Sequence, residues 1–307
     1  MRVRFWGTRG SLPTPLTAAA VAHKLTAAAA RLAEGCPVES LPFHLRATYG
    51  GNTSCLQVDS GAGRLLLDAG TGLRDYGHWL ARQGADTPQE HHLLLSHTHW
   101  DHIMGLPFFG PVYAPGQRVT IYGCHPSLEQ RLAIQWQPSH FPVRFDRLAD
   151  NLRFVQLRHG EPIEIAGTVV TALAQRHPGA SYAYKLEHGG RTVVYSTDSE
   201  QKGMRDHRTQ AFIEFCHGVD LLVFDAMYSF VDACTDKEDW GHSSNVTGIE
   251  IAKRATVKHL YLFHHDPMHD DERLDEILEE SRQYASHYRP EVPLEVSMAY
   301  DGLEVAV

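Results

Sequence analysis

Short runs of hydrophobic residues with the spacing of β-strands open the chain. These runs occupy residues 2–6, 54–59 and 64–67. The third run ends in Asp68-Ala-Gly-Thr-Gly72, a glycine-rich turn. Between the first two runs, the segment from Thr17 to Glu34 is rich in alanine and stops at Gly35, which predicts a helix and its end. We expect this helix to be an insertion that covers the molecule or contacts another subunit, or else borders the active site.

Strand-like and helix-like segments then interleave to the end of the chain. We expect strands at residues 93–95, 119–122, 152–157, 169–174, 182–187, 191–196, 221–224 and 259–263, and a terminal strand pair at 294–299 and 302–307. We expect helices at residues 126–135, 209–216, 245–255 and 271–287. His188-Gly-Gly190 predicts a hairpin turn. Because no linker or repeat interrupts the pattern, residues 1–307 are expected to form one α/β domain, two sheets between layers of helices.

Composition and charge narrow the range of partners. The 307 residues are 43% hydrophobic, as in ordinary folded proteins, and 37 acidic residues against 28 basic ones give a net charge of -9. We therefore do not expect an extended nucleic acid as ligand, because the chain lacks the excess of positive charge that would neutralise many phosphates. No apolar run is long enough for a membrane span or a signal peptide. Five scattered cysteines without a CxxC pair suggest reduced thiols, and so a cytoplasmic protein.

The strongest chemical signal is a hexapeptide that follows the expected strand at 93–95. It reads His97-Thr-His99-Trp-Asp101-His102. Alternate residues of an extended chain point the same way, so His97 and His99 can face one ion while Asp101 and His102 reach a second. The competing interpretation is a surface cluster in a chain that holds 21 histidines.

A site for two ions needs more donors than one hexapeptide supplies. His177, Asp198 and His264 each follow the end of an expected strand. Taken alone, each would be an ordinary polar residue, but together with the hexapeptide they become candidate ligands. His265 competes with His264, because periodicity cannot choose between neighbours at a strand end.

These residues, in this order, resemble the HxHxDH, His, Asp, His pattern of the metallo-β-lactamase superfamily. The resemblance covers almost the whole chain and implies a four-layer αββα sandwich. It further implies that His97, His99 and His177 hold one divalent metal, that Asp101, His102 and His264 hold the other, and that Asp198 bridges the two. Asp68 matches the first acidic position of the family and is expected to orient a ligand rather than bind metal. Zinc is the first candidate metal, and manganese and iron are alternatives.

Five further segments are similar to the phosphodiesterase branch of this superfamily, which includes cyclic phosphate phosphodiesterases and the tRNA 3′-processing endonuclease. They are residues 7–11, 50–54, 96–107, 224–228 and 240–244. Two cations a few ångströms apart can hold a shared hydroxide and neutralise the oxygens of a phosphodiester. His242 is then the candidate general acid, with Asp225 orienting it, and Asp101 also contacts the nucleophile. Alternatively, His242 is a surface residue before the helix caps Ser243 and Ser244.

The segment from Phe230 to Gly241 is expected to form a loop over the site. Trp240 or Tyr228 could stack on a base or a sugar, or could simply pack under this loop. Arg9 is a candidate for assisting the metals with the charge of the substrate.

We expect a phosphodiesterase for a small cyclic phosphate or cyclic nucleotide, in a homodimer. In tRNA-processing relatives a long arm commonly lies between the ligands that correspond to His177 and Asp198, whereas here only a compact hairpin joins them. The alanine-rich insertion could be an arm in another place, but Lys24 and Arg31 alone would grip RNA weakly. The tRNA 3′-processing endonuclease remains the alternative enzyme, and a metal-binding sensor or interaction module without catalysis remains the alternative from another class.

Overall fold

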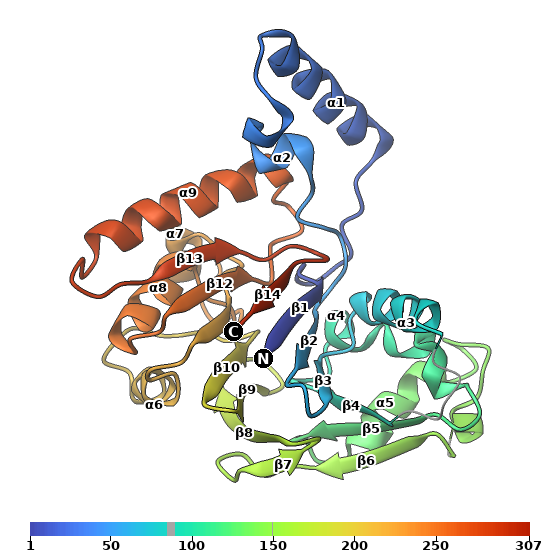
Figure 1. Ribbon diagram of the computed structural model, residues 1–307. Helices are drawn as coiled ribbons and strands as arrows, with labels where there is room; N and C mark the ends of the chain where they lie inside the picture. Colours follow the sequence, from blue (N-terminus) through green and yellow to red (C-terminus); the bar gives the residue numbers. More distant parts are fainter. Residues whose placement is uncertain (85–89, 149) are drawn as a thin grey trace.

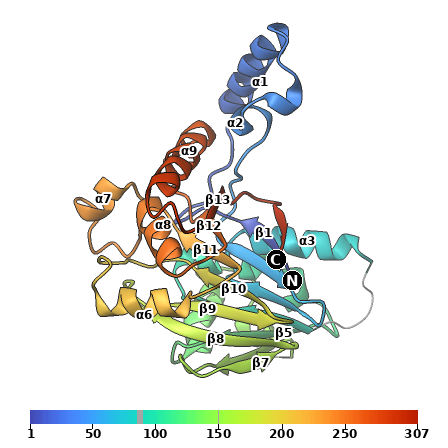
Figure 2. The ribbon, with the colours of Figure 1, turned by 60° about the vertical axis from the view of Figure 1, so that its left-hand side comes forward.

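The computed structural model describes residues 1–84, 90–148 and 150–307. Two seven-stranded sheets face each other, and helices cover their outer faces (Figure 1; Figure 2). The expected four-layer αββα sandwich is therefore confirmed.

The first sheet is formed mainly by the N-terminal half of the chain. Its strands, in spatial order, are β14 (Glu304–Ala306), β1 (Arg2–Gly7), β2 (Cys55–Asp59), β3 (Arg64–Leu67), β4 (Glu90–Leu94), β5 (Arg118–Gly123) and β6 (Leu152–Gln156). The strands from β3 to β6 run parallel to one another. The carboxyl ends of β3, β4 and β5 therefore lie at one edge of the sheet.

The second sheet is formed by the C-terminal half. Its strands, in spatial order, are β13 (Glu295–Met298), β12 (His259–Phe263), β11 (Leu221–Asp225), β10 (Arg191–Ser196), β9 (Ser181–His188), β8 (Thr168–Gln175) and β7 (Ile163–Ile165). Strands β10 to β13 are parallel, and β9 is antiparallel to both β8 and β10. Strands β8, β10, β11 and β12 consequently end at the same edge of this sheet.

The helices follow the strands in the pattern of an α/β protein. They are α1 (Ala18–Ala33), α2 (Phe43–Arg46), α3 (Gly72–Arg82), α4 (Trp100–Ile103), α5 (Leu128–Ala133), α6 (His207–Phe215), α7 (Phe230–Cys234), α8 (Asn245–Arg254) and α9 (Asp271–His287). In the described part of the chain, none combines the length and the apolar character needed to cross a membrane.

Three apolar layers hold the sandwich together. The middle layer lies between the sheets and includes Phe5, Leu56, Tyr184 and Phe263, all fully buried. A second layer joins the first sheet to α3 and α5, and a third joins the other sheet to α6, α8 and α9. Burial of this apolar surface is the main force that fixes the two sheets against each other.

Two expectations need correction, and one helix was missed. The last two strands do not pair with each other, because β13 joins β12 in the second sheet while β14 joins β1 in the first. The helix expected at 126–135 begins only at Leu128, because Ser127 adopts a left-handed backbone conformation, and it ends in a 3-10 turn, Ile134–Trp136. Helix α3 was not expected, although Leu73, Tyr76 and Leu80 are buried at helical spacing on its inner face.

The alanine-rich segment does form a helix, α1, which Figures 1 and 2 show projecting from the sandwich together with α2. The side chain of Thr17 caps its first turn by accepting a hydrogen bond from the Ala20 amide. None of the sixteen residues of this described helix is buried. Lys24 ties it to the body through the carboxylate of Asp271 in α9 and the carbonyl of Ala47.

Candidate metal centre

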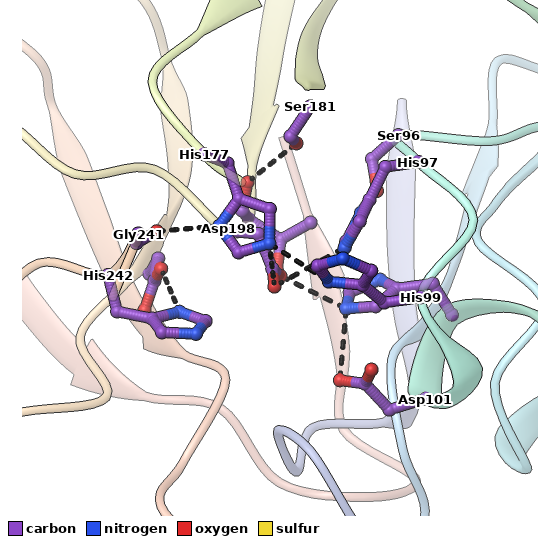
Figure 3. A network of polar contacts seen from close by, with 12 residues as sticks. Ser96, His97, His99, Asp101, His177, Ser181, Asp198, Gly241 and His242 are labelled. Carbon is purple, nitrogen blue, oxygen red and sulfur yellow. Dashed lines mark hydrogen bonds and ion pairs between the residues drawn. The ribbon is translucent and has the colours of Figure 1, made fainter. Parts of the chain in front are cut away.

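The loops after β4, β8, β10 and β12 meet where these strands of the two sheets end. They bring together the seven candidate ligands His97, His99, Asp101, His102, His177, Asp198 and His264. Figure 3 shows His97, His99 and His177 gathered around Asp198. Residues that are far apart in the sequence thus form two adjoining donor groups, which share Asp198.

The first group consists of three histidines and one aspartate. The Nε2 atom of His177 lies 3.0 Å from Nδ1 of His99. The Oδ2 atom of Asp198 lies 3.5 Å from Nε2 of His97 and 3.5 Å from Nε2 of His177. His99 is exposed, so this group opens toward solvent.

The second group is entirely buried. The Oδ1 atom of Asp198 lies 3.0 Å from Nε2 of His102 and 3.1 Å from Nε2 of His264. The Oδ2 atom of Asp101 lies 3.1 Å and 3.2 Å from the same two nitrogens, which are 3.3 Å apart. The two oxygens of Asp198 therefore face different groups, so this one carboxylate could serve an ion in each.

The donor atoms fit the dimensions of a metal site. Ligands bound to one ion at about 2.0–2.2 Å lie about 3–3.6 Å from each other, which is the range of the distances above. The Nε2 atom of His97 is buried and lacks a hydrogen-bond partner in the described part of the chain. A buried polar nitrogen is costly unless something binds it, and a cation among these donors would do so.

A buried hydrogen-bond network sets which ring nitrogen each histidine presents to the centre. Asp68, fully buried after β3, accepts bonds from Nδ1 of His102 at 2.8 Å, from the Ser96 amide and hydroxyl at 2.7 Å, and from the Tyr195 hydroxyl at 2.8 Å. Nδ1 of His97 lies 3.0 Å from the Ser96 hydroxyl. Both histidines thus direct Nε2 toward Asp198, and Asp68 has the orienting place expected of it.

His177 is oriented by the backbone of a distant loop. Its Nδ1 atom lies 2.9 Å from the carbonyl of Gly241. Gly241 has a φ of +90°, and an added Cβ would lie 2.2 Å from Nδ1 of His177. Only glycine lets the loop approach His177 so closely.

The structure distinguishes between His264 and His265. His264 directs Nε2 into the second donor group, whereas Nε2 of His265 lies 2.8 Å from the carbonyl of Ala299. Burial lowers the pKa of His265 to about 3, with the nearby Arg9 adding to this effect. The geometry therefore places His264, not His265, among the candidate donors, and His265 joins the loop to the last strands.

Arg9 does not have the place that its expected role requires. Its guanidinium group donates to the backbone carbonyls of Gly50, Asp266 and His269, and it lies 3.8 Å from Oδ1 of Asp271. Because these partners occupy it within the protein, Arg9 supports the loop after β12 instead of meeting a substrate.

His242 and Asp225 form a pair beside the two donor groups. Asp225, at the end of β11, lies 2.9 Å from Nδ1 of His242 and also accepts bonds from the Ser199 and Met227 amides. Figure 3 shows His242 on the opposite side of Asp198 from His99. Burial opposes the charged imidazolium, but the carboxylate of Asp225 outweighs it and raises the pKa of His242 to about 9. The contact expected between Asp225 and His242 is present, and His242 is not a surface residue.

Sequence reasoning missed Glu200, which holds the loop that carries His242. Its buried carboxylate accepts hydrogen bonds from the amides of Asp239 and Gly241 and pairs with Lys202. Ser243 adds a bond to the carbonyl of Ser199. No local pattern marks Glu200, since the two amides that it binds lie about forty residues away. Only its place two residues after Asp198 hints at the site.

Residues 63–265 match the family model of the Beta-lactamase superfamily domain. The chain therefore belongs to the metallo-β-lactamase superfamily, as the sequence motifs indicate, and it is a metal-dependent hydrolase.

The individual proteins that this chain resembles share little sequence identity with it. The Probable metallo-hydrolase YhfI of Bacillus subtilis (strain 168) is 26% identical over 235 residues, covering 72% of this chain and 84% of that protein. Ribonuclease Z of Anoxybacillus flavithermus is 27% identical over 234 residues, covering 62% and 73%. The crystal structure of a diphosphatase from the PhnP family has a TM-score of 0.63 at 21% identity, covering 100% of this chain and 97% of that one. At this identity the structural match shows the shared fold.

Proposed function

We propose that this protein is a dinuclear metal-dependent phosphodiesterase for a small cyclic phosphate or cyclic nucleotide. One observation carries the proposal. The two oxygens of Asp198 face two separate donor groups, and His242 lies beside these groups without being a member of either. Two divalent ions bound there, zinc first among the candidates, supply an activated water and neutralise the phosphoryl oxygens.

Two residues of the chain, Asp101 and His242, have further roles in the proposed reaction. Asp101 is held by the Ser11 amide, which donates to its Oδ2 atom at 2.8 Å. His242 keeps Nδ1 against Asp225, so Nε2 is the atom that carries a proton toward the leaving group. Hydrolysis forms a bond from the water oxygen to phosphorus and breaks the bond to the leaving oxygen, which takes the Nε2 proton of His242.

The shape and charge of the described chain support a small substrate. Only the β9–β10 hairpin separates His177 from Asp198, and the net charge is -9. A folded RNA needs several phosphate contacts away from the cleavage site, whereas a small phosphodiester needs only the centre itself.

The tRNA 3′-processing endonuclease is the second candidate, since one relative is a ribonuclease Z and α1 projects as an arm. The arm has few cations, however. Lys24 forms an ion pair with Asp271, and the guanidinium group of Arg31 lies 3.9 Å from the carboxylate of Glu34. This arm would give RNA little electrostatic grip.

The test starts from metal-reconstituted protein. We expect two ions per chain by elemental analysis, and hydrolysis of bis(p-nitrophenyl) phosphate that a chelator abolishes. Catalytic efficiency is then compared between a cyclic nucleotide panel and precursor tRNA at physiological salt. One ion or none per chain would refute the dinuclear site. Site-specific tRNA cleavage with no activity on any cyclic phosphate would favour the nuclease.

A further inference from the structure

A row of rings and one cation leads from the donor groups to the protein surface. The His264 and His242 rings stack with centroids 5.1 Å apart, and the Tyr228 ring meets His242 edge-on at 5.3 Å. The Nζ atom of Lys237 lies 5.5 Å from the centroid of Tyr228 and 4.0 Å from that of Trp240. The row thus begins at a donor residue, passes the candidate general acid and ends at an indole.

The outer end of this row is available for binding. Trp240 is 55% exposed, a costly arrangement for the largest apolar side chain. Lys237 has no carboxylate within 4 Å in the described part of the chain. The acids next to it, Glu238 and Asp239, pair instead with Lys202. An exposed indole and a cation with no carboxylate within 4 Å therefore lie together, with the ammonium group over the indole ring.

The loop that carries these groups is held in place. Glu200 binds the amides of Asp239 and Gly241, on both sides of Trp240. Tyr228 is buried, and its amide donates to the carbonyl of Ser243, next to His242. The position of the row relative to His242 is thus set by contacts within the protein before any ligand arrives.

We propose that Tyr228, Lys237 and Trp240 form the subsite for the leaving group, and that this group is a nucleotide with a second anionic group. The inference rests on the proposed function. Because His242 protonates the leaving oxygen, whatever is attached to that oxygen extends along the row. A base then stacks on the face of Trp240 opposite Lys237, and a second phosphate pairs with Lys237.

Three substrates separate the parts of this subsite. Ribose cyclic phosphate has neither a base nor a second anion, adenosine 2′,3′-cyclic phosphate has the base, and its 5′-phosphorylated form has both. We expect wild-type kcat/KM to rise along this series. Trp240→Ala should raise KM roughly tenfold to a hundredfold for the two base-containing substrates and leave ribose cyclic phosphate unchanged. Lys237→Met should affect only the 5′-phosphorylated substrate, and Lys237→Arg should restore most of its binding.

Trp100 provides the matched control. It is 58% exposed and directly follows His99, which Figure 3 shows on the opposite side of Asp198 from His242. Trp100→Ala should leave the ranking of the three substrates intact, and Trp240→Phe should keep most of the stacking.

Several outcomes would overturn the subsite. An equal loss on all three substrates in Trp240→Ala, or no loss on any, would show that Trp240 does not bind the base. A change in oligomeric state without a change in KM would assign the exposed ring to contacts between chains. Wild-type protein that hydrolyses none of the three substrates would refute the proposed function itself, which separates the two failures.

Discussion

Asp68 illustrates how one buried carboxylate orders a site without belonging to it. It receives four hydrogen bonds from the backbone and side chain of Ser96, from His102 and from Tyr195. Its backbone has a φ of +61°, and those of Asp198 and His264 have φ of +50° and +62°. Non-glycine residues rarely adopt this conformation. Three of the key residues at strand ends are therefore strained, which is common at functional sites.

The first residue-scale prediction concerns Asp68→Asn. An amide of the same shape keeps the packing but places donors against the donors of Ser96 and His102, so the ring of His102 loses its fixed orientation. We expect metal affinity to fall about tenfold to a hundredfold, measured by competition with a chelator. Asp150→Asn, at an exposed position, is the control. Unchanged affinity in Asp68→Asn would show that the network does not support the donors.

The second residue-scale prediction concerns His242→Ala. The variant should retain its metal content and lose about a hundredfold to ten-thousandfold in kcat on substrates with alkoxide leaving groups. The loss should be much smaller with p-nitrophenolate, which needs little protonation. His217→Ala, which changes an exposed histidine, serves as the control. An equal loss for both kinds of leaving group would assign His242 to structure or binding.

At the scale of elements, two turns next to the candidate metal centre pack backbone against backbone. Gly105 ends the segment that begins with α4, which carries Asp101 and His102, and it packs on the turn at Gly70 after β3. A Cβ at position 105 would lie 1.9 Å from the carbonyl oxygen of Gly70. The close packing of this segment on the turn after β3 thus depends on two glycines, Gly70 and Gly105.

Gly105→Ala should therefore force these turns apart. We expect the free energy of unfolding to fall by about 1–3 kcal/mol, and metal affinity to fall with it, because Asp101 and His102 move. Denaturant titration gives the first quantity and chelator competition the second. Gly110→Ala is a matched change at an exposed glycine with nothing within 4 Å of the added carbon. Equal effects of the two substitutions would contradict this account of Gly105.

The elements also show what a sequence can and cannot predict. Apolar runs identified the strands that precede the donors, because the residues of a buried strand are themselves apolar and can be found in the sequence. The partners of the last two strands could not be predicted, because pairing with β12 or β1 depends on distant parts of the chain. Helix α3 was missed because Gly72 and Gly77 obscure its pattern.

The same limit applies to the candidate site. The hexapeptide and three strand-end residues could be found, since each has a local position that suits a ligand. The choice between His264 and His265 required the contact of His265 with Ala299, and the role of Arg9 required its carbonyl partners. Both depend on long-range geometry.

At the scale of the whole molecule, Asp301 joins the turn between the last strands to the opening segments of the chain. Its carboxylate accepts hydrogen bonds from the amides of Gly51 and Asn52 and from the hydroxyl of Thr8. Burial nevertheless raises the pKa of Asp301 to about 6, above the usual value of about 3.9. The charged form is thus less favourable in the folded state than in the unfolded chain.

This shift predicts a pH dependence. Between about pH 4 and pH 6 the unfolded chain releases the proton of Asp301 while the folded protein keeps it, so stability falls as pH rises. The contribution is at most about 3 kcal/mol and is constant above pH 7. Asp301→Asn cannot titrate, so its free energy of unfolding should rise relative to wild type by up to this amount across that window. Parallel curves for the two proteins would contradict the shift.

The donor groups also have a mechanical consequence. His97, His99, Asp101 and His102 extend from the first sheet, whereas His177, Asp198 and His264 extend from the second. An ion held by both sets is a cross-link between the two halves of the sandwich. Withdrawal of metal should therefore weaken the protein as a whole, and the melting temperature should rise with free metal concentration by mass action. Catalysis and cohesion would then depend on the same few atoms.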